Sequence, residues 1–92
     1  MADFDDLKFR LRNNVDLVQL AERYIPSLKR AGSTFKGLCP FHEEKTPSFV
    51  IYPEKNHYIC FGCGQSGDIF KFVMEIERLE FIEAMIFLGR QC

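Results

Sequence analysis

The segment CPFHEEKTPSFVIYPEKNHYICFGC, residues 39–63, decides the fold of this chain. It begins with the pair Cys39-x-x-His42 and, after seventeen intervening residues, ends with the pair Cys60-x-x-Cys63. Two such pairs about one hairpin apart are typical of a Cys₃His structural zinc site, because each pair occupies a tight turn and the two turns together supply a tetrahedron. Four protein ligands leave no coordination position for a reactive water. The spacing therefore predicts one structural zinc ion per chain, with no catalytic role for the metal or its ligands.

Other interpretations of the same residues explain less of the pattern. Cys60-x-x-Cys63 alone could be a redox pair, but such pairs open a helix in a βαβ unit and would leave Cys39 and His42 without a role. Cys39 with His42 could resemble a nucleophile and its base. His57 and Cys92 are spare candidate ligands; we exclude both, since His57 faces away from Cys60 in a regular strand and Cys92 has no paired neighbour.

The residues around the two ligand pairs are predicted to form short antiparallel strands. Apolar and aromatic runs bounded by Gly, Pro or Asn predict hairpins. The expected strands are Leu28–Arg30, Thr34–Leu38, Ser48–Tyr52 and His57–Phe61.

Helical periodicity lies on both sides of these strands. A first helical region breaks near Asn13 and resumes behind Asp16 as an N-cap, and a second region starts at Asp68 and stops at Gly89. We therefore predict one α+β domain over 1–92: helical 3–25, a zinc-ribbon-like antiparallel sheet 28–64, and helical 68–89.

Composition sets the remaining limits. The 92 residues are 47% hydrophobic with a net charge of −1, which excludes intrinsic disorder and a globally basic nucleic-acid binder. No apolar run is long enough for a membrane span, and the acidic N-terminus lacks the basic start of a signal peptide, so we expect a cytoplasmic protein without membrane contact. Residues 28–63 carry five basic and three acidic groups, whereas residues 64–92 carry three basic and five acidic groups.

A family resemblance rests on the central segment. Residues 37–49, then residues 58–64, Gly67 and Asp68, closely resemble the N-terminal zinc-binding domain of bacterial DnaG-type DNA primases. Residues 15–18, 28–32 and 81–84 also fit that family.

The resemblance implies a module that engages single-stranded template DNA when a primase initiates an RNA primer. It also implies a polymerase domain acting in cis or in trans, which uses Mg²⁺, and a C-terminal domain that binds the replicative helicase; both are absent here. The parent would then be an enzyme of the bacterial replisome, and this chain alone would not polymerise. The alternative is a zinc-stapled protein-interaction or regulatory domain derived from a primase.

Given that resemblance, the basic excess of the sheet region suggests where DNA binds. Basic residues interleaved with aromatic ones on a sheet can form a base-stacking platform. Sequence alone does not tell which face of the sheet meets solvent, and Phe41 and Phe61 could instead shield the zinc. The candidate contacts are Arg30, Lys36, Lys45, Lys55 and Tyr58.

Overall fold

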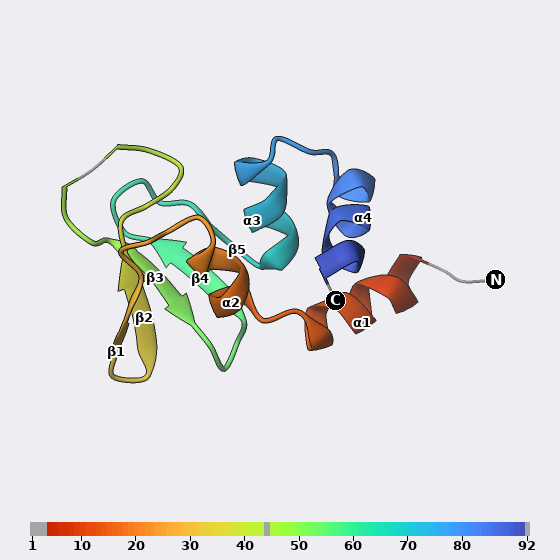
Figure 1. The fold of residues 1–92 in the computed structure, drawn as a ribbon, viewed down its shortest axis with the longest axis horizontal. Coiled ribbons are helices and arrows are strands. Elements are labelled where there is room, and N and C mark those ends of the chain that lie inside the picture. Colours follow the sequence, from red (N-terminus) through yellow and green to blue (C-terminus); the bar gives the residue numbers. More distant parts are fainter. Residues whose placement is uncertain (1–3, 44, 92) are drawn as a thin grey trace.

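Five short strands form one antiparallel sheet in which every strand pairs with its neighbour in the chain, in the order β1-β2-β3-β4-β5. The computed structural model describes residues 4–43 and 45–91. Figure 1 shows the sheet at one end of the molecule and the helices gathered beside it. The strands are β1 (Lys29–Ala31), β2 (Thr34–Gly37), β3 (Phe49–Tyr52), β4 (His57–Cys60) and β5 (Ser66–Gly67). The helices are α1 (Phe4–Asn14), α2 (Leu17–Glu22), α3 (Ile69–Ile76) and α4 (Phe81–Gln91).

The α+β architecture with flanking helices is confirmed, and the structure changes two of the predicted boundaries. The sheet continues past residue 64, because β5 pairs with β4. Helix α4 does not stop at Gly89 but continues to Gln91. Asp3, which the sequence suggests as the N-cap of the first helical region, lies outside the described residues.

Aspartate side chains start two of the helices. The backbone N–H of Val18 donates to Oδ1 of Asp16 at 2.9 Å, and that of Phe70 donates to Oδ1 of Asp68 at 3.1 Å. Each carboxylate therefore satisfies an N–H group that has no partner within its helix.

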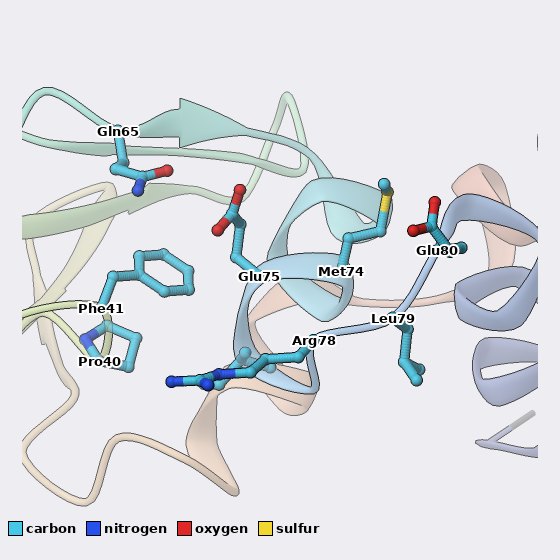
Figure 2. A pocket seen from close by; sticks show the side chains of 9 residues that line it. Pro40, Phe41, Gln65, Met74, Glu75, Arg78, Leu79 and Glu80 are labelled. Carbon is cyan, nitrogen blue, oxygen red and sulfur yellow. The ribbon is translucent and has the colours of Figure 1, made fainter.

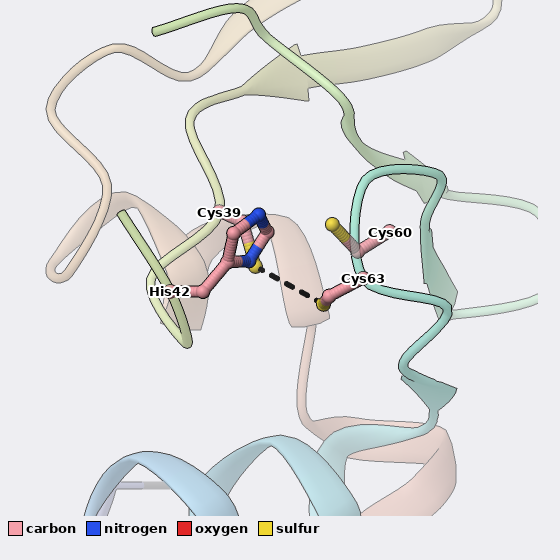
Figure 3. Close-up of side chains that lie close together, drawn as sticks. All are labelled: Cys39, His42, Cys60 and Cys63. Carbon is pink, nitrogen blue, oxygen red and sulfur yellow. Dashed lines mark hydrogen bonds between the residues drawn. The ribbon is translucent and has the colours of Figure 1, made fainter. Parts of the chain in front are cut away.

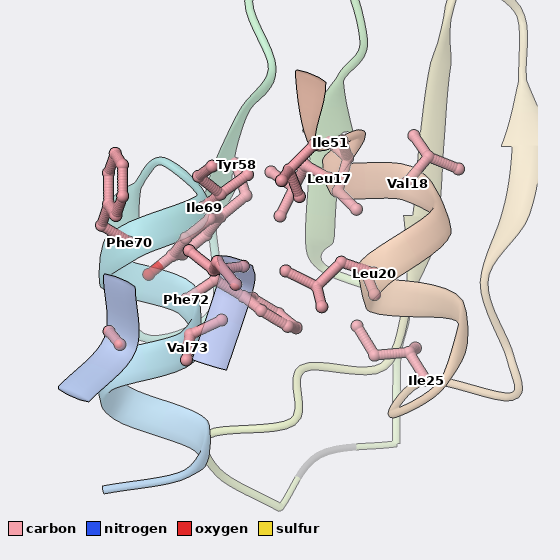
Figure 4. Packing of buried hydrophobic residues seen from close by; sticks show 14 of the residues in the cluster. Leu17, Val18, Leu20, Ile25, Ile51, Tyr58, Ile69, Phe70, Phe72 and Val73 are labelled. Carbon is pink, nitrogen blue, oxygen red and sulfur yellow. The ribbon is translucent and has the colours of Figure 1, made fainter. Parts of the chain in front are cut away.

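Alternation along the strands gives the sheet two faces. Residues paired across strands share a face, and the register places Phe35 opposite Ile51 and Ile51 opposite Tyr58. Ile51 and Tyr58 are fully buried and pack in one cluster with residues of the helices (Figure 4), so this is the core face. The opposite side is called the open face here. It comprises Lys29, Lys36, Val50, Tyr52, His57, Ile59, Ser66 and, one residue beyond β4, Phe61.

The core lies between the sheet, α2 and α3. Figure 4 shows Leu20 and Ile25 facing Phe72 and Val73 of α3, with Ile51 of the sheet beside them. Four rings fill the part nearest the metal-ligand turns, with every pair of ring centroids 5.1–6.2 Å apart. These rings belong to Phe41, Phe49, Tyr58 and Phe72.

Asn56 ties the β3–β4 turn to the N-terminal helices. Its Oδ1 accepts the N–H of Leu17 at 2.8 Å, and its Nδ2 donates to the carbonyl of Val15 at 2.7 Å. The backbone of Asn56 has a φ of 52°, a left-handed conformation that asparagine tolerates better than most residues. One side chain thus fixes the link between α1 and α2 against the hairpin.

Helix α1 packs on the C-terminal half. The guanidinium of Arg12 pairs with Asp68 at 3.1 Å and lies over the ring of Phe70, and Lys8 lies over the ring of Phe81. Among the described residues, no helix is long and apolar enough to cross a membrane.

Candidate metal centre

Two chain turns bring the four predicted ligands to one point. Cys39 and His42 lie in the turn that follows β2, and Cys60 and Cys63 lie in the turn at the end of β4 (Figure 3). The two strands are separated by β3, which pairs with both. The ligand atoms of the four residues all lie within 4.8 Å of one another. In the described part of the chain, this cluster does not include His57; Cys92 lies outside the described residues.

The spacing of the sulfur atoms fits a tetrahedral ion. Cys39 Sγ and Cys63 Sγ are 3.9 Å apart. Two thiolates bound to one zinc ion with bonds of about 2.3 Å lie about 3.8 Å apart in a tetrahedron, whereas a disulfide requires about 2.05 Å. Three soft sulfur donors and one imidazole are the donor set that zinc prefers. The residues therefore fit one zinc ion.

The burial and number of the ligands are those of a structural metal site rather than a reactive one. Cys39 and Cys60 are buried and His42 is half-buried, while Cys63 is exposed. Every ligand comes from the protein, so a zinc ion held here has no position left for a substrate or an activated water. Such an ion links two turns of the chain and supplies no chemistry beyond that.

Backbone geometry shapes the second turn. The N–H of Gly64 donates to the carbonyl of Cys60 at 2.8 Å, and the N–H of Cys60 donates to the carbonyl of Gln65 at 2.7 Å. Gly64 has a φ of 79°, a conformation that a residue with a Cβ adopts only with strain. The loop therefore closes tightly enough to place Cys60 and Cys63 beside each other.

The thiols differ in how readily they lose a proton. Burial raises the pKa of Cys39 to about 12, against the weaker opposing effect of the Phe41 N–H that donates to its sulfur at 3.4 Å. Burial also acts on Cys60, but hydrogen bonds from the backbone of Cys63, from the side chains of Ser48 and Cys39, and from the backbone of Gly62 outweigh it and lower its pKa to about 7. Zinc binding must therefore displace a tightly held proton from Cys39, which makes affinity fall at low pH.

Comparison with known proteins assigns nearly the whole chain to one family. The sequence profile of the CHC2 zinc finger family matches residues 5–92. The chain belongs to the CHC2 zinc finger family. This CHC2 finger is 44% identical over 81 residues to the DNA primase of Chlamydia trachomatis and 51% identical over 74 residues to that of Geobacillus stearothermophilus. Those alignments cover 88% and 80% of this chain but only 13% and 12% of the relatives.

A solved structure agrees with this assignment. The crystal structure of the zinc-binding and RNA polymerase domains of the Aquifex aeolicus primase superposes with a TM-score of 0.86 and 37% sequence identity. The match covers 99% of this chain and 22% of that chain. The resemblance to primase zinc-binding domains is thus confirmed, and the CHC2 finger corresponds to a small part of much longer relatives.

The predicted DNA contacts of the CHC2 finger do not all lie on one face of the sheet. Lys36 is exposed on the open face, where it pairs with Lys29. Lys45 is exposed in the loop between β2 and β3, and Lys55 is exposed in the β3–β4 turn. Arg30 pairs with Phe35 and so belongs to the edge of the core face.

Tyr58 is not accessible for base stacking in this structure. It is fully buried, and its ring stacks on Phe49 at 5.1 Å. The cause is the strand alternation: Tyr58 and Cys60 share the face that meets the core, whereas His57, Ile59 and Phe61 point the other way. Phe61 is 67% exposed and does not shield the metal, while Phe41 packs into the aromatic core.

Sequence reasoning missed the aromatic residues of the open face. Tyr52 and His57 face each other across β3 and β4, and Phe61 stands at the metal end of the same side. The sequence held a usable signal: once Cys60 is assigned inward to the metal, its odd-numbered neighbours must point outward.

A pocket of about 560 Å³ lies on the other side of the finger, beside Phe41 (Figure 2). Its lining includes one basic side chain, Arg78, against the carboxylates of Glu75 and Glu80. That balance does not favour a phosphate group, so the pocket is a poor candidate for a nucleotide site.

Proposed function

We propose that this chain is the zinc-binding domain of a DNA primase, that Cys39, His42, Cys60 and Cys63 hold one structural zinc ion, and that the open face binds single-stranded template DNA. The zinc holds the β2 and β4 turns together and keeps the sheet in shape. The DNA then lies across the sheet and is positioned for the start of an RNA primer.

The observation that carries the DNA proposal is the composition of the open face. It combines exposed or half-exposed aromatic rings with positive charge, the two features that proteins use to hold single strands. Phe61, Tyr52 and His57 supply rings, and Lys29 and Lys36 supply adjacent charges. Lys45 and Lys55 add charge at opposite ends of the β3 segment.

Charge also favours this face over the helical side. Residues 28–63, which hold the strands β1 to β4, carry a formal excess of two positive charges, and residues 64–92 carry a formal excess of two negative charges. Zinc with three thiolates adds one negative charge to the sheet region, so the attraction stays modest. Binding by the isolated domain should be weak and strongly dependent on salt.

Fluorescence anisotropy with labelled single-stranded oligonucleotides at two salt concentrations tests this assignment. Phe61→Ala should weaken binding by about 1–3 kcal/mol with little change in salt dependence, since it removes stacking. Phe9→Ala is the matched control, because Phe9 on α1 is equally exposed at 67%. If the two substitutions have the same effect, the open face is not the DNA-binding face.

The charge contribution is tested by a second matched pair. Lys36→Ala should lower affinity for all sequences and reduce the salt slope by about 0.7. Lys71→Ala, an exposed lysine on α3, should leave both unchanged. Loss of binding in Lys71→Ala with normal binding in Lys36→Ala would move the DNA to the helical side.

We assign primer synthesis itself to the rest of a longer primase. The polymerase domain, its Mg²⁺ ions and any contact with the replicative helicase would then lie outside this chain, which spans 12–13% of the primases compared above. In such a protein, Phe61→Ala and Lys36→Ala should lower primer initiation more than elongation. Equal losses in both steps would contradict the template-binding role.

A protein-interaction role is the second candidate, and α4 supports it. Ile82 and Ile86 lie one helical turn apart on α4 and are 53% and 54% exposed. We propose this surface as a contact for the polymerase domain. Replacing both isoleucines with Ser should leave oligonucleotide binding unchanged and weaken association with a separately produced polymerase domain.

A further inference from the structure

Ser48 lies between the two metal-ligand turns, directly before β3. Its carbonyl accepts the N–H of Phe61 at 2.9 Å, which fixes its backbone to the Cys60–Cys63 turn. Its hydroxyl oxygen lies 3.6 Å from Cys60 Sγ. The serine is therefore attached to the metal centre by both its main chain and its side chain.

The direction of the side-chain hydrogen bond follows from the metal. A cysteine that binds zinc does so as a thiolate and has no proton to give. The Ser48 hydroxyl must then donate to Cys60 Sγ. Cys60 is fully buried, so this donor acts on its sulfur together with the backbone N–H groups of Gly62 and Cys63.

We propose that Ser48 is a positioning residue for the metal: its hydroxyl orients the Cys60 thiolate and withdraws negative charge from that sulfur. This inference rests on the zinc site proposed above and names a residue that does not itself bind the ion. Partners that hydrogen-bond to metal ligands typically contribute about 10–100-fold to metal affinity.

The charge effect distinguishes Ser48 from a residue that only fills space. Removing a hydrogen bond to a thiolate makes the sulfur a stronger electron donor. In protein loaded with Co²⁺ in place of zinc, the sulfur-to-metal charge-transfer band then moves to longer wavelength. A packing defect alone would lower thermal stability without moving that band.

Two isosteric variants separate the hydroxyl from the volume it occupies. Ser48→Thr keeps the donor, and Ser48→Val has the shape of threonine without it. Ser48→Ala removes the donor without adding volume, and Ser33→Ala, in the exposed β1–β2 turn, controls for a serine away from the metal. Zinc affinity is measured by competition with a chromogenic chelator, and the Co²⁺ spectrum is recorded for each folded variant.

We expect Ser48→Val and Ser48→Ala to bind zinc at least about tenfold more weakly than wild type and to show the longer-wavelength band. Ser48→Thr and Ser33→Ala should behave as wild type. Wild-type affinity and an unshifted band in Ser48→Ala would overturn the inference, and so would equal losses in Ser48→Thr and Ser48→Val. If the wild-type chain itself retains no zinc, the proposed metal site is at fault instead.

Discussion

Removing zinc should unfold most of the sheet, because the free energy of zinc binding is comparable to the total stability expected for a chain of this length. A chain of 92 residues has a total stability of about 5–14 kcal/mol. Structural zinc sites contribute about 10–16 kcal/mol of apparent binding free energy, which is as large as that total. The metal-free chain is therefore expected to have no stable native state at 25 °C.

Phe41 connects the metal-ligand turn to the hydrophobic core, so loss of zinc also disturbs the core. Its position between Cys39 and His42 means that an ordered metal turn holds its ring against Phe49 and Phe72, at 6.0 and 5.7 Å. When the turn is released, the core loses a large aromatic side chain, a change comparable to a Phe→Ala substitution at about 3–5 kcal/mol. The damage thus reaches α3 as well as the strands.

Thermal melting followed by circular dichroism, with amide NMR spectra, tests this expectation. A strong chelator should abolish the cooperative transition and collapse the dispersed amide peaks of residues 36–64, and added zinc should restore both. Cys63→Ser should imitate the chelator, whereas Ser33→Ala should not. An unchanged melting temperature and unchanged spectra after verified zinc removal would refute the linkage between metal and fold.

Substitutions at three further residues have defined outcomes. Tyr58→Phe should leave stability unchanged or raise it by about 1 kcal/mol in chemical denaturation, because the buried hydroxyl has no hydrogen-bond partner among the described residues, while Tyr58→Ala should cost about 3–5 kcal/mol. Asn56→Gly should cost about 1–3 kcal/mol, since it keeps the left-handed backbone but leaves the Leu17 N–H without its acceptor; a neutral result would mean that water replaces the tether. Burial and the 2.7 Å hydrogen bond to Glu77 raise the pKa of Tyr24 to about 12. The stability that the protonated Tyr24 hydroxyl contributes is present below its ordinary pKa of about 10 and is lost as pH rises to about 12. The free energy of unfolding of Tyr24→Phe should therefore decrease less than that of the wild type over this pH interval.

The sequence was informative where a residue's role depends on its near neighbours. Asp16 is recognisable as a helix N-cap, and Asp68 as the start of a helical region, because a capping side chain bonds to backbone N–H groups two or three residues ahead. The two ligand pairs were recognisable for the same reason: each lies in one turn. Only the convergence of the two turns, within 4.8 Å, needed the structure.

Features that depend on distant packing were not predictable. The strand β5 consists of Ser66 and Gly67, which have low strand propensity, and its structure comes from pairing with Ile59 and Tyr58. Alternation in β4 predicts two faces but does not by itself tell which of them the helices cover; Tyr58 can be placed inward only by the additional step of assigning Cys60 to the metal. Gly89 ends no helix because a glycine stops a helix only where the chain turns left-handed, and its φ is not positive.

The composition of β3 has a consequence for aggregation. Phe49, Val50 and Ile51 form a buried, uncharged segment of high β propensity, and β3 is the central strand of the sheet. In the folded chain both of its edges are occupied by β2 and β4, and the metal centre joins those two partners across its end. A chain without metal would expose that segment for pairing with other chains. Pro47 and Pro53 flank it, and because proline has no N–H to donate, they limit how far an intermolecular strand can extend in either direction.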